Sequence, residues 1–132
     1  MSKPEISVFY VSIFERRELR ETIEKIYTTA CQENWDSEGA SAIISTSRNT
    51  ALSLVGLLPQ NMNEPEISST PHGEIDFDWI NDGREMLTLS ICPDGSLAWS
   101  AQYEHFTCQG DSPWKQELSC PLECCLQHFC QD

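Results

Sequence analysis

The chain has 132 residues, a typical single-domain length, and its 39% of hydrophobic residues is enough for one core. Twenty-one acidic residues against eight basic ones give a formal net charge of −13, so we expect the chain to repel phosphate backbones rather than bind nucleic acid. Its apolar runs are shorter than the roughly 20 residues of a membrane span, and its start lacks a secretory signal pattern. These features predict a cytoplasmic protein with no membrane segment. Its acidity either keeps it in solution or attracts a basic partner.

The N-terminal part predicts a strand followed by a helix. The run from Ile6 to Phe14 is rich in β-branched and aromatic residues, which favours a buried strand. Ser12 and Glu15 have the spacing of a capping box, which favours a helix start nearby. Apolar residues then recur every three or four positions, as in a helix that ends before Asn34: Leu19, Ile23, Ile26, Tyr27 and Ala30.

A second helix is expected from about Ser45 to Leu58, because its apolar content is high and Pro59 stops it. The following residues, Gln60–Gly73, contain prolines and polar residues without periodicity. They predict an extended connector across the surface.

Three segments in which apolar and polar residues alternate give the clearest structural signal. Asn81-Asp82-Gly83 and Pro93-Asp94-Gly95 supply turns between them, which predicts an antiparallel meander. With the N-terminal segment, we expect an α+β fold with a three- or four-stranded sheet covered on one face by the two helices. Trp79 and Trp99 should be buried on that face, in phase with Ile75, Phe77, Leu97 and Tyr103.

The last part of the chain differs in character. Residues Phe106–Ser119 predict an irregular segment, and Cys120-Pro121 predicts the start of a short helix with proline in its first turn. The expected organisation is an α+β domain over residues 1–105 and a cysteine-rich tail over residues 106–132 that packs on the same domain.

Three motifs carry a family resemblance: Asn34-Trp35-Asp36 with Gly39-Ala40, Pro71-His72-Gly73-Glu74-Ile75 leading to Trp79, and Pro93-Asp94-Gly95. They resemble a widespread group of small bacterial and mobile-element proteins of unassigned function, whose members read NWD-x-x-GA and then P-x-G-x-I-x-x-x-W. The resemblance covers about residues 34–103. It implies a shared α+β fold and no particular chemistry.

The cysteines suggest a metal site as one alternative. Cys120, Cys124 and His128 would share one face of a helix, and Cys108 could complete a tetrahedral zinc site. However, the Cys-x-x-Cys pair typical of such sites is missing, and thiols often pack as small hydrophobic groups. We therefore expect no cofactor, with zinc as the alternative.

Catalytic motifs are missing from the sequence. It has no Gly-x-Ser-x-Gly, phosphate-binding glycine loop or His-Glu-x-x-His, and His72 and His105 have no recognisable partners. A calcium loop is disfavoured because Ile80 occupies position five of a loop that would begin with Asp76 at position one. We therefore expect a protein that is not an enzyme.

The remaining interpretation is an acidic module that binds a basic protein. Glu74, Asp76, Asp78 and Asp82 cluster on the polar side of one predicted strand and its turn, and they form the expected contact patch. Trp35 and Asp36 are further contact candidates, although local turn formation also accounts for them. The expected partner handles nucleic acid, and the chain would inhibit it in an anti-CRISPR, anti-defence or antitoxin-like role. The alternative is a zinc- or thiol-dependent protein that uses the C-terminal cysteines and His128.

Overall fold

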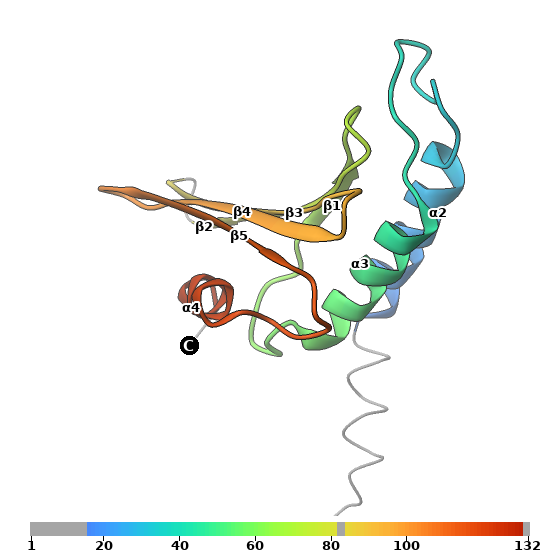
Figure 1. Cartoon of the computed structure of the whole chain (residues 1–132). Helices are drawn as coiled ribbons and strands as arrows, with labels where there is room; N and C mark the ends of the chain where they lie inside the picture. Colours follow the sequence, from blue (N-terminus) through green and yellow to red (C-terminus); the bar gives the residue numbers. More distant parts are fainter. Residues whose placement is uncertain (1–15, 82–83, 131–132) are drawn as a thin grey trace, which may run out of the picture.

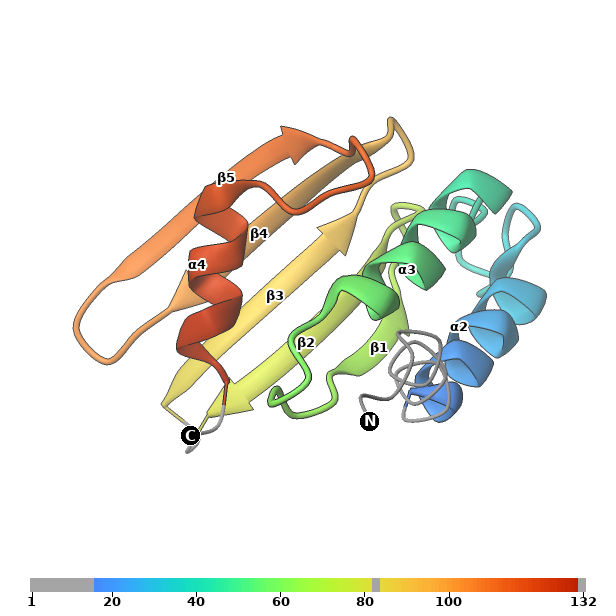
Figure 2. The same ribbon diagram turned by 90° about the horizontal axis from the view of Figure 1, so that it is seen from below.

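The computed structural model describes residues 16–81 and 84–130, which form an α+β fold. Its strands pair in chain order as a five-stranded antiparallel meander (Figures 1 and 2), so the sheet has five strands instead of the three or four expected. The elements are α2 (Arg17–Ala30), α3 (Ser45–Leu57), β1 (Glu66–Ser69), β2 (Ile75–Asn81), β3 (Glu85–Ile91), β4 (Ser96–Gln102), β5 (Thr107–Pro113) and α4 (Cys120–His128). The predicted strand Ile6–Phe14 and the capping box at Ser12 and Glu15 lie outside the described residues.

Two strands correct the sequence-based expectation. β1 lies in the stretch expected to be a connector, and β5 lies in the stretch expected to be irregular. Both are edge strands, which need no regular apolar face, and most of their residues are exposed or half-buried. β5 pairs with β4 along its whole length, so residues 107–113, expected to be irregular, belong to the sheet.

The described helices cover only one face of the sheet. α3 and α4 lie on the same side of it, and α2 packs outside α3, beside β1 (Figures 1 and 2). α4 begins at a Ser119 N-cap, whose hydroxyl accepts the backbone N–H of Leu122, and it contains the expected proline. None of the helices in residues 16–81 and 84–130 has both the length and the apolar character that a bilayer crossing needs.

The core lies between the sheet and its helices. The predicted burial of Trp79 and Trp99 is confirmed, since they are only 3% and 6% exposed. The indole N–H of Trp79 donates a hydrogen bond to the backbone oxygen of Asn63 at 2.9 Å, so its polar atom is satisfied in the core. The helix α4 contributes its own buried side chains, which are Leu122, Cys125, Leu126 and Phe129.

One close contact holds β5 against the rest of the core. Trp99 of β4 lies directly across Gly110 of β5. A Cβ atom added to Gly110 would lie 2.6 Å from Cζ2 of the Trp99 ring, closer than real Cβ atoms approach. The indole therefore occupies the space that a side chain would need, which explains a glycine in the middle of a strand.

We expect Gly110→Ala to lower the free energy of unfolding by about 1–3 kcal/mol, the usual cost of overpacking. The measurement is urea unfolding followed by tryptophan fluorescence. Cys108→Ala is the matched control, because Cys108 lies on the same strand and is exposed. Equal stability of the Gly110→Ala variant and the wild type would contradict the packing described for Trp99.

Candidate functional site

The second face of the sheet carries no described helix (Figure 1). We call it the open face. It is formed by alternate residues of the five strands, as the cross-strand register sets them: Glu66, Ser68, Asp76, Asp78, Ile80, Met86, Thr88, Ser90, Ala98, Ser100, Gln102, Thr107, Gln109 and Asp111.

Acidic residues gather at the β1–β2 side of the open face. Glu66 of β1 lies directly opposite Asp78 of β2. Asp76 precedes Asp78 by two residues on β2 and points to the same face. Like charges placed directly opposite each other destabilise a strand pair. The ion pairs found within the described residues involve other carboxylates, which are Glu21, Glu24, Glu85 and Glu104. The acids of this side therefore form no ion pair with a basic residue in the described part of the chain.

The two aspartates of β2 have different surroundings. The carboxylate of Asp78 accepts a hydrogen bond from the Thr88 hydroxyl on the neighbouring strand. In contrast, Oδ1 of Asp76 is buried and has no hydrogen-bond partner. Burial raises the pKa of Asp76, the Ser90 hydroxyl lowers it in part, and the charges of Asp78 and Glu74 raise it further. Ionised Asp76 is therefore held in an environment that disfavours its charge.

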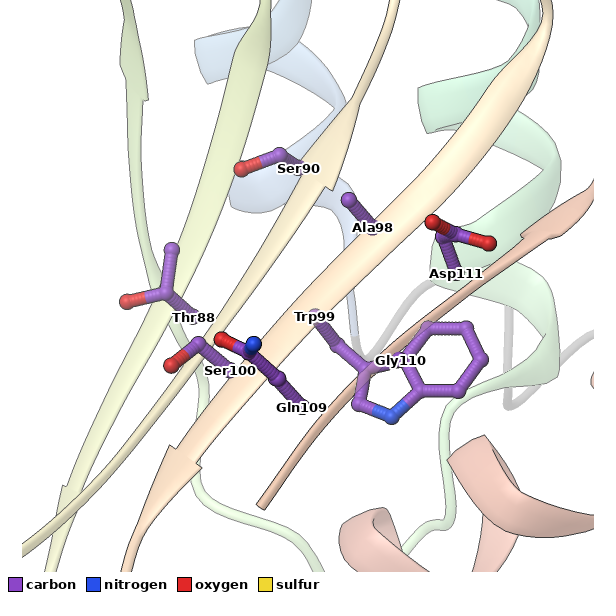
Figure 3. A pocket seen from close by; sticks show the side chains of 8 residues that line it. All are labelled: Thr88, Ser90, Ala98, Trp99, Ser100, Gln109, Gly110 and Asp111. Atoms are coloured by element: carbon purple, nitrogen blue, oxygen red, sulfur yellow. The ribbon is translucent and has the colours of Figure 1, made fainter. Parts of the chain in front are cut away.

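The centre of the open face is a depression of about 520 Å³. Its lining consists of short or polar side chains from β3, β4 and β5, and Figure 3 shows them beside the Trp99 ring that lies against Gly110. The residues that point to this side are Thr88, Ser90, Ala98, Ser100, Gln109 and Asp111. Such a surface can accept the side chains of a partner, because no bulky group of its own fills it.

Two exposed apolar residues adjoin the acids. Ile80 and Met86 lie opposite each other on β2 and β3, and they are 65% and 40% exposed. Neither residue was among the contact residues predicted from the sequence. The sequence pattern does mark them, because Ile80 and Met86 are apolar residues at positions where the alternation of their strands otherwise places polar residues. An exposed apolar pair beside charged residues is typical of a contact surface.

The predicted contact residues fall into two separate places. Glu74 immediately precedes β2, where its carboxylate accepts a hydrogen bond from the Thr70 hydroxyl, so it adjoins Asp76 and Asp78. Asp82 lies outside the described residues.

Trp35 and Asp36 lie instead in the loop after α2. The carboxylate of Asp36 accepts the backbone N–H groups of Glu38 and Ala40 at 2.8 and 3.0 Å. The Trp35 indole donates to the backbone oxygen of Ser41 at 2.8 Å, and its ring packs against the core. These contacts give both residues a role in forming the loop.

Three of the four predicted zinc residues border a second hollow, which has a volume of about 560 Å³. Cys108, Cys124 and His128 line it, whereas Cys120 does not. Residues 16–81 and 84–130 contain no group of three His, Cys, Asp or Glu side chains placed to hold a metal ion.

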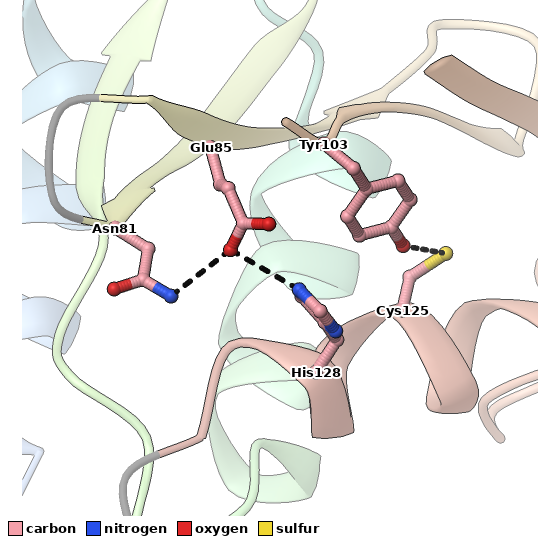
Figure 4. Close-up of polar contacts among 5 residues, drawn as sticks. All are labelled: Asn81, Glu85, Tyr103, Cys125 and His128. Carbon is pink, nitrogen blue, oxygen red and sulfur yellow. Dashed lines mark hydrogen bonds and ion pairs between the residues drawn. The ribbon is translucent and has the colours of Figure 1, made fainter. Parts of the chain in front are cut away.

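Four of the polar groups around this hollow have partners, and they are those of Glu85, His128, Tyr103 and Cys125 (Figure 4). Nε2 of His128 lies 3.2 Å from Oε1 of Glu85, which also accepts from the side-chain amide of Asn81. The Tyr103 hydroxyl donates to the sulfur of Cys125 at 3.6 Å, and burial together with that thiol raises the pKa of Tyr103. His128 is therefore tied to β3 through Glu85.

The raised pKa of Asp76 predicts a pH-dependent effect of Asp76→Asn. The folded state holds the proton of Asp76 more tightly than the unfolded chain does, so the ionised carboxylate destabilises the fold above its folded-state pKa. We expect Asp76→Asn to raise the free energy of unfolding near pH 7. The gain should disappear as the pH falls below about 4, where the acid is protonated in both states.

The measurement is the free energy of unfolding in urea at several pH values between about 3 and 7. This range extends below the ordinary Asp pKa of about 4, which applies to the unfolded chain. Asp111→Asn removes the same charge from an exposed position on the same face and is the control. An equal gain in both variants would mean that net charge, and not the burial of Asp76, is responsible.

Comparison of the chain with protein-family models, with curated proteins and with solved structures found no match.

Proposed function

We propose that this protein is a non-enzymatic binding module whose open face meets a basic surface on another protein. The observation that supports this function most directly is the group of acids formed by Glu66, Asp76 and Asp78. They lie on a paired sheet, form no ion pair with a described basic residue, and adjoin the exposed side chains of Ile80 and Met86.

The chemistry of this surface suits arginine and lysine. A guanidinium or ammonium group placed between Glu66 and Asp78 would relieve the repulsion between two carboxylates that lie directly opposite each other. Ile80 and Met86 would supply an apolar anchor beside the charged contacts, as in most protein interfaces. Because the strands hold these side chains in register, little conformational entropy is lost when a partner binds.

The partner class follows from the charge. A chain of 15.0 kDa with a net charge of −13 is attracted to surfaces that normally meet a phosphate backbone. We propose that the partner is a basic, nucleic-acid-handling protein and that binding blocks its nucleic-acid site. An anti-CRISPR, anti-defence or antitoxin-like inhibitor fits this description.

A capture experiment with three baits tests the proposal. The face variant carries Glu66→Gln, Asp76→Asn and Asp78→Asn. The control variant carries Glu38→Gln, Glu117→Gln and Glu123→Gln, which remove the same charge from exposed positions away from the open face. We expect the wild type and the control to retain the same basic protein from a lysate of the source cells, and the face variant to lose it.

Surface plasmon resonance with the captured protein then measures how the association rate depends on these charges and on salt. The face variant should associate at least about tenfold more slowly at low salt, and the difference should shrink near 0.5 M salt, where the screening length is about 4 Å. Equal capture and equal association rates for the face variant and the wild type would contradict the proposal.

One observation favours the alternative, a zinc- or thiol-dependent protein. Cys108, Cys124 and His128 line the same hollow, next to the buried thiol of Cys125. We expect the purified protein to carry no stoichiometric zinc, because the described residues form no three-ligand group.

Elemental analysis of protein expressed in zinc-supplemented medium checks this expectation. About one zinc per chain, lost when Cys120 and Cys124 are replaced by serine, would favour the alternative over the binding module.

A further inference from the structure

The strand β5 is an exposed edge of the sheet, and no described strand pairs with its outer side (Figure 2). Its hydrogen-bond pattern follows from the ends of the β4–β5 hairpin. Tyr103 donates its N–H to Phe106, and Trp114 donates its N–H to Gly95. In an antiparallel pair such hydrogen-bonded positions recur every two residues. Positions 108, 110 and 112 therefore bond to β4, and the N–H and C=O groups of Thr107, Gln109 and Asp111 point outward.

We propose that a second copy of this chain pairs with β5 in the antiparallel direction, which joins the two sheets into one. The edge is self-complementary in the register that places Gln109 opposite Gln109 of the second copy. Thr107 then lies opposite Asp111 of the other copy, and the three outward N–H groups of each strand all meet a carbonyl. The two copies are joined by six backbone hydrogen bonds, three from each.

Neighbouring registers are worse for identifiable reasons. A register centred on Asp111 would place two carboxylates directly opposite each other, which is unfavourable. A register centred on Gly110 would also form six backbone hydrogen bonds, but it would place the Thr107 carbonyl opposite Pro113, which has no N–H to donate. The register centred on Gln109 is therefore the one that pairs every outward N–H and C=O group of Thr107, Gln109 and Asp111.

The charge along this edge permits the contact between two acidic chains. Asp111 is the only charged residue in Thr107–Pro113. The acids Glu66, Asp76 and Asp78 lie on β1 and β2, at the other edge of the sheet. The remaining repulsion between two chains of charge −13 acts at long range and is screened by salt. Salt should therefore strengthen this dimer, while it weakens binding to a basic partner.

The symmetry of the pairing determines what the dimer presents. The two-fold axis of an antiparallel strand pair runs perpendicular to the sheet, so both open faces lie on the same side. This inference does not depend on the proposed function. If both hold, the dimer offers two acidic patches to one partner surface.

The test uses the purified full chain in analytical ultracentrifugation over a range of concentrations at low and high salt. We expect a mass near twice 15.0 kDa at high concentration, with tighter association at high salt.

Gln109→Pro removes an outward N–H without removing a bond to β4, and proline is tolerated on the outer side of edge strands. It should weaken dimerisation at least about tenfold. Gln109→Ala keeps the N–H and should stay within about twofold of the wild type.

Amide hydrogen exchange of the wild type provides a measurement that does not depend on a variant. The amides of Thr107, Gln109 and Asp111 should become protected as the dimer forms and should lose this protection on dilution. A monomer at all concentrations and salts would overturn the proposal. A dimer in which these three amides stay unprotected would also overturn it, because the interface would then lie elsewhere. The triple variant of Glu66, Asp76 and Asp78 should still dimerise, so the failure of either proposal can be recognised separately.

Discussion

The alternation of apolar and polar residues along β2, β3 and β4 is the constraint on which the rest of the structure depends. It places Phe77, Leu89 and Leu97 on one face, where α3 and α4 must exclude water from them, and it leaves the other face in solvent. The position of the helices follows from this requirement. The same requirement creates the open face, because a side chain that is not needed for the core is free to serve another purpose.

The periodic parts of the chain could be predicted from sequence, and the parts that depend on pairing could not. The strands around Trp79 and Trp99 and the helix ending before Asn34 show clear apolar periods, and the helix ending before Pro59 shows high apolar content and a proline stop, so their place in the core was predictable. β1 and β5 pair through backbone hydrogen bonds at the sheet edges. Such pairing does not require alternating apolar and polar residues, so the sequence does not reveal it. The acids of β2 were identified as contact candidates, but their cross-strand neighbour Glu66 was not, since its position depends on a strand that only the register reveals.

The acids of the open face have a physical cost that solubility alone does not explain. Charge that only keeps a protein in solution can be placed on fully exposed helix positions, such as Glu18 and Glu21 of α2. Asp76 is instead half-buried, with one oxygen that lacks a partner and with Asp78 and Glu74 as like-charged neighbours. A second protein that supplied cations would offset this cost, and this is the physical basis of the proposed binding role.

The contact between Trp99 and Gly110 also has a consequence for how the molecule opens. Apart from this contact, β5 is held mainly by its ladder to β4, whereas β2, β3 and β4 each have a neighbour on both sides and several fully buried side chains. Local unfolding should therefore start at the β5 edge, at a free energy below that of global unfolding. Each such opening uncovers the indole of Trp99 together with the edge of β4, a combination that favours misassembly between chains. The packing of Trp99 against Gly110 therefore works against this opening as well as filling the core.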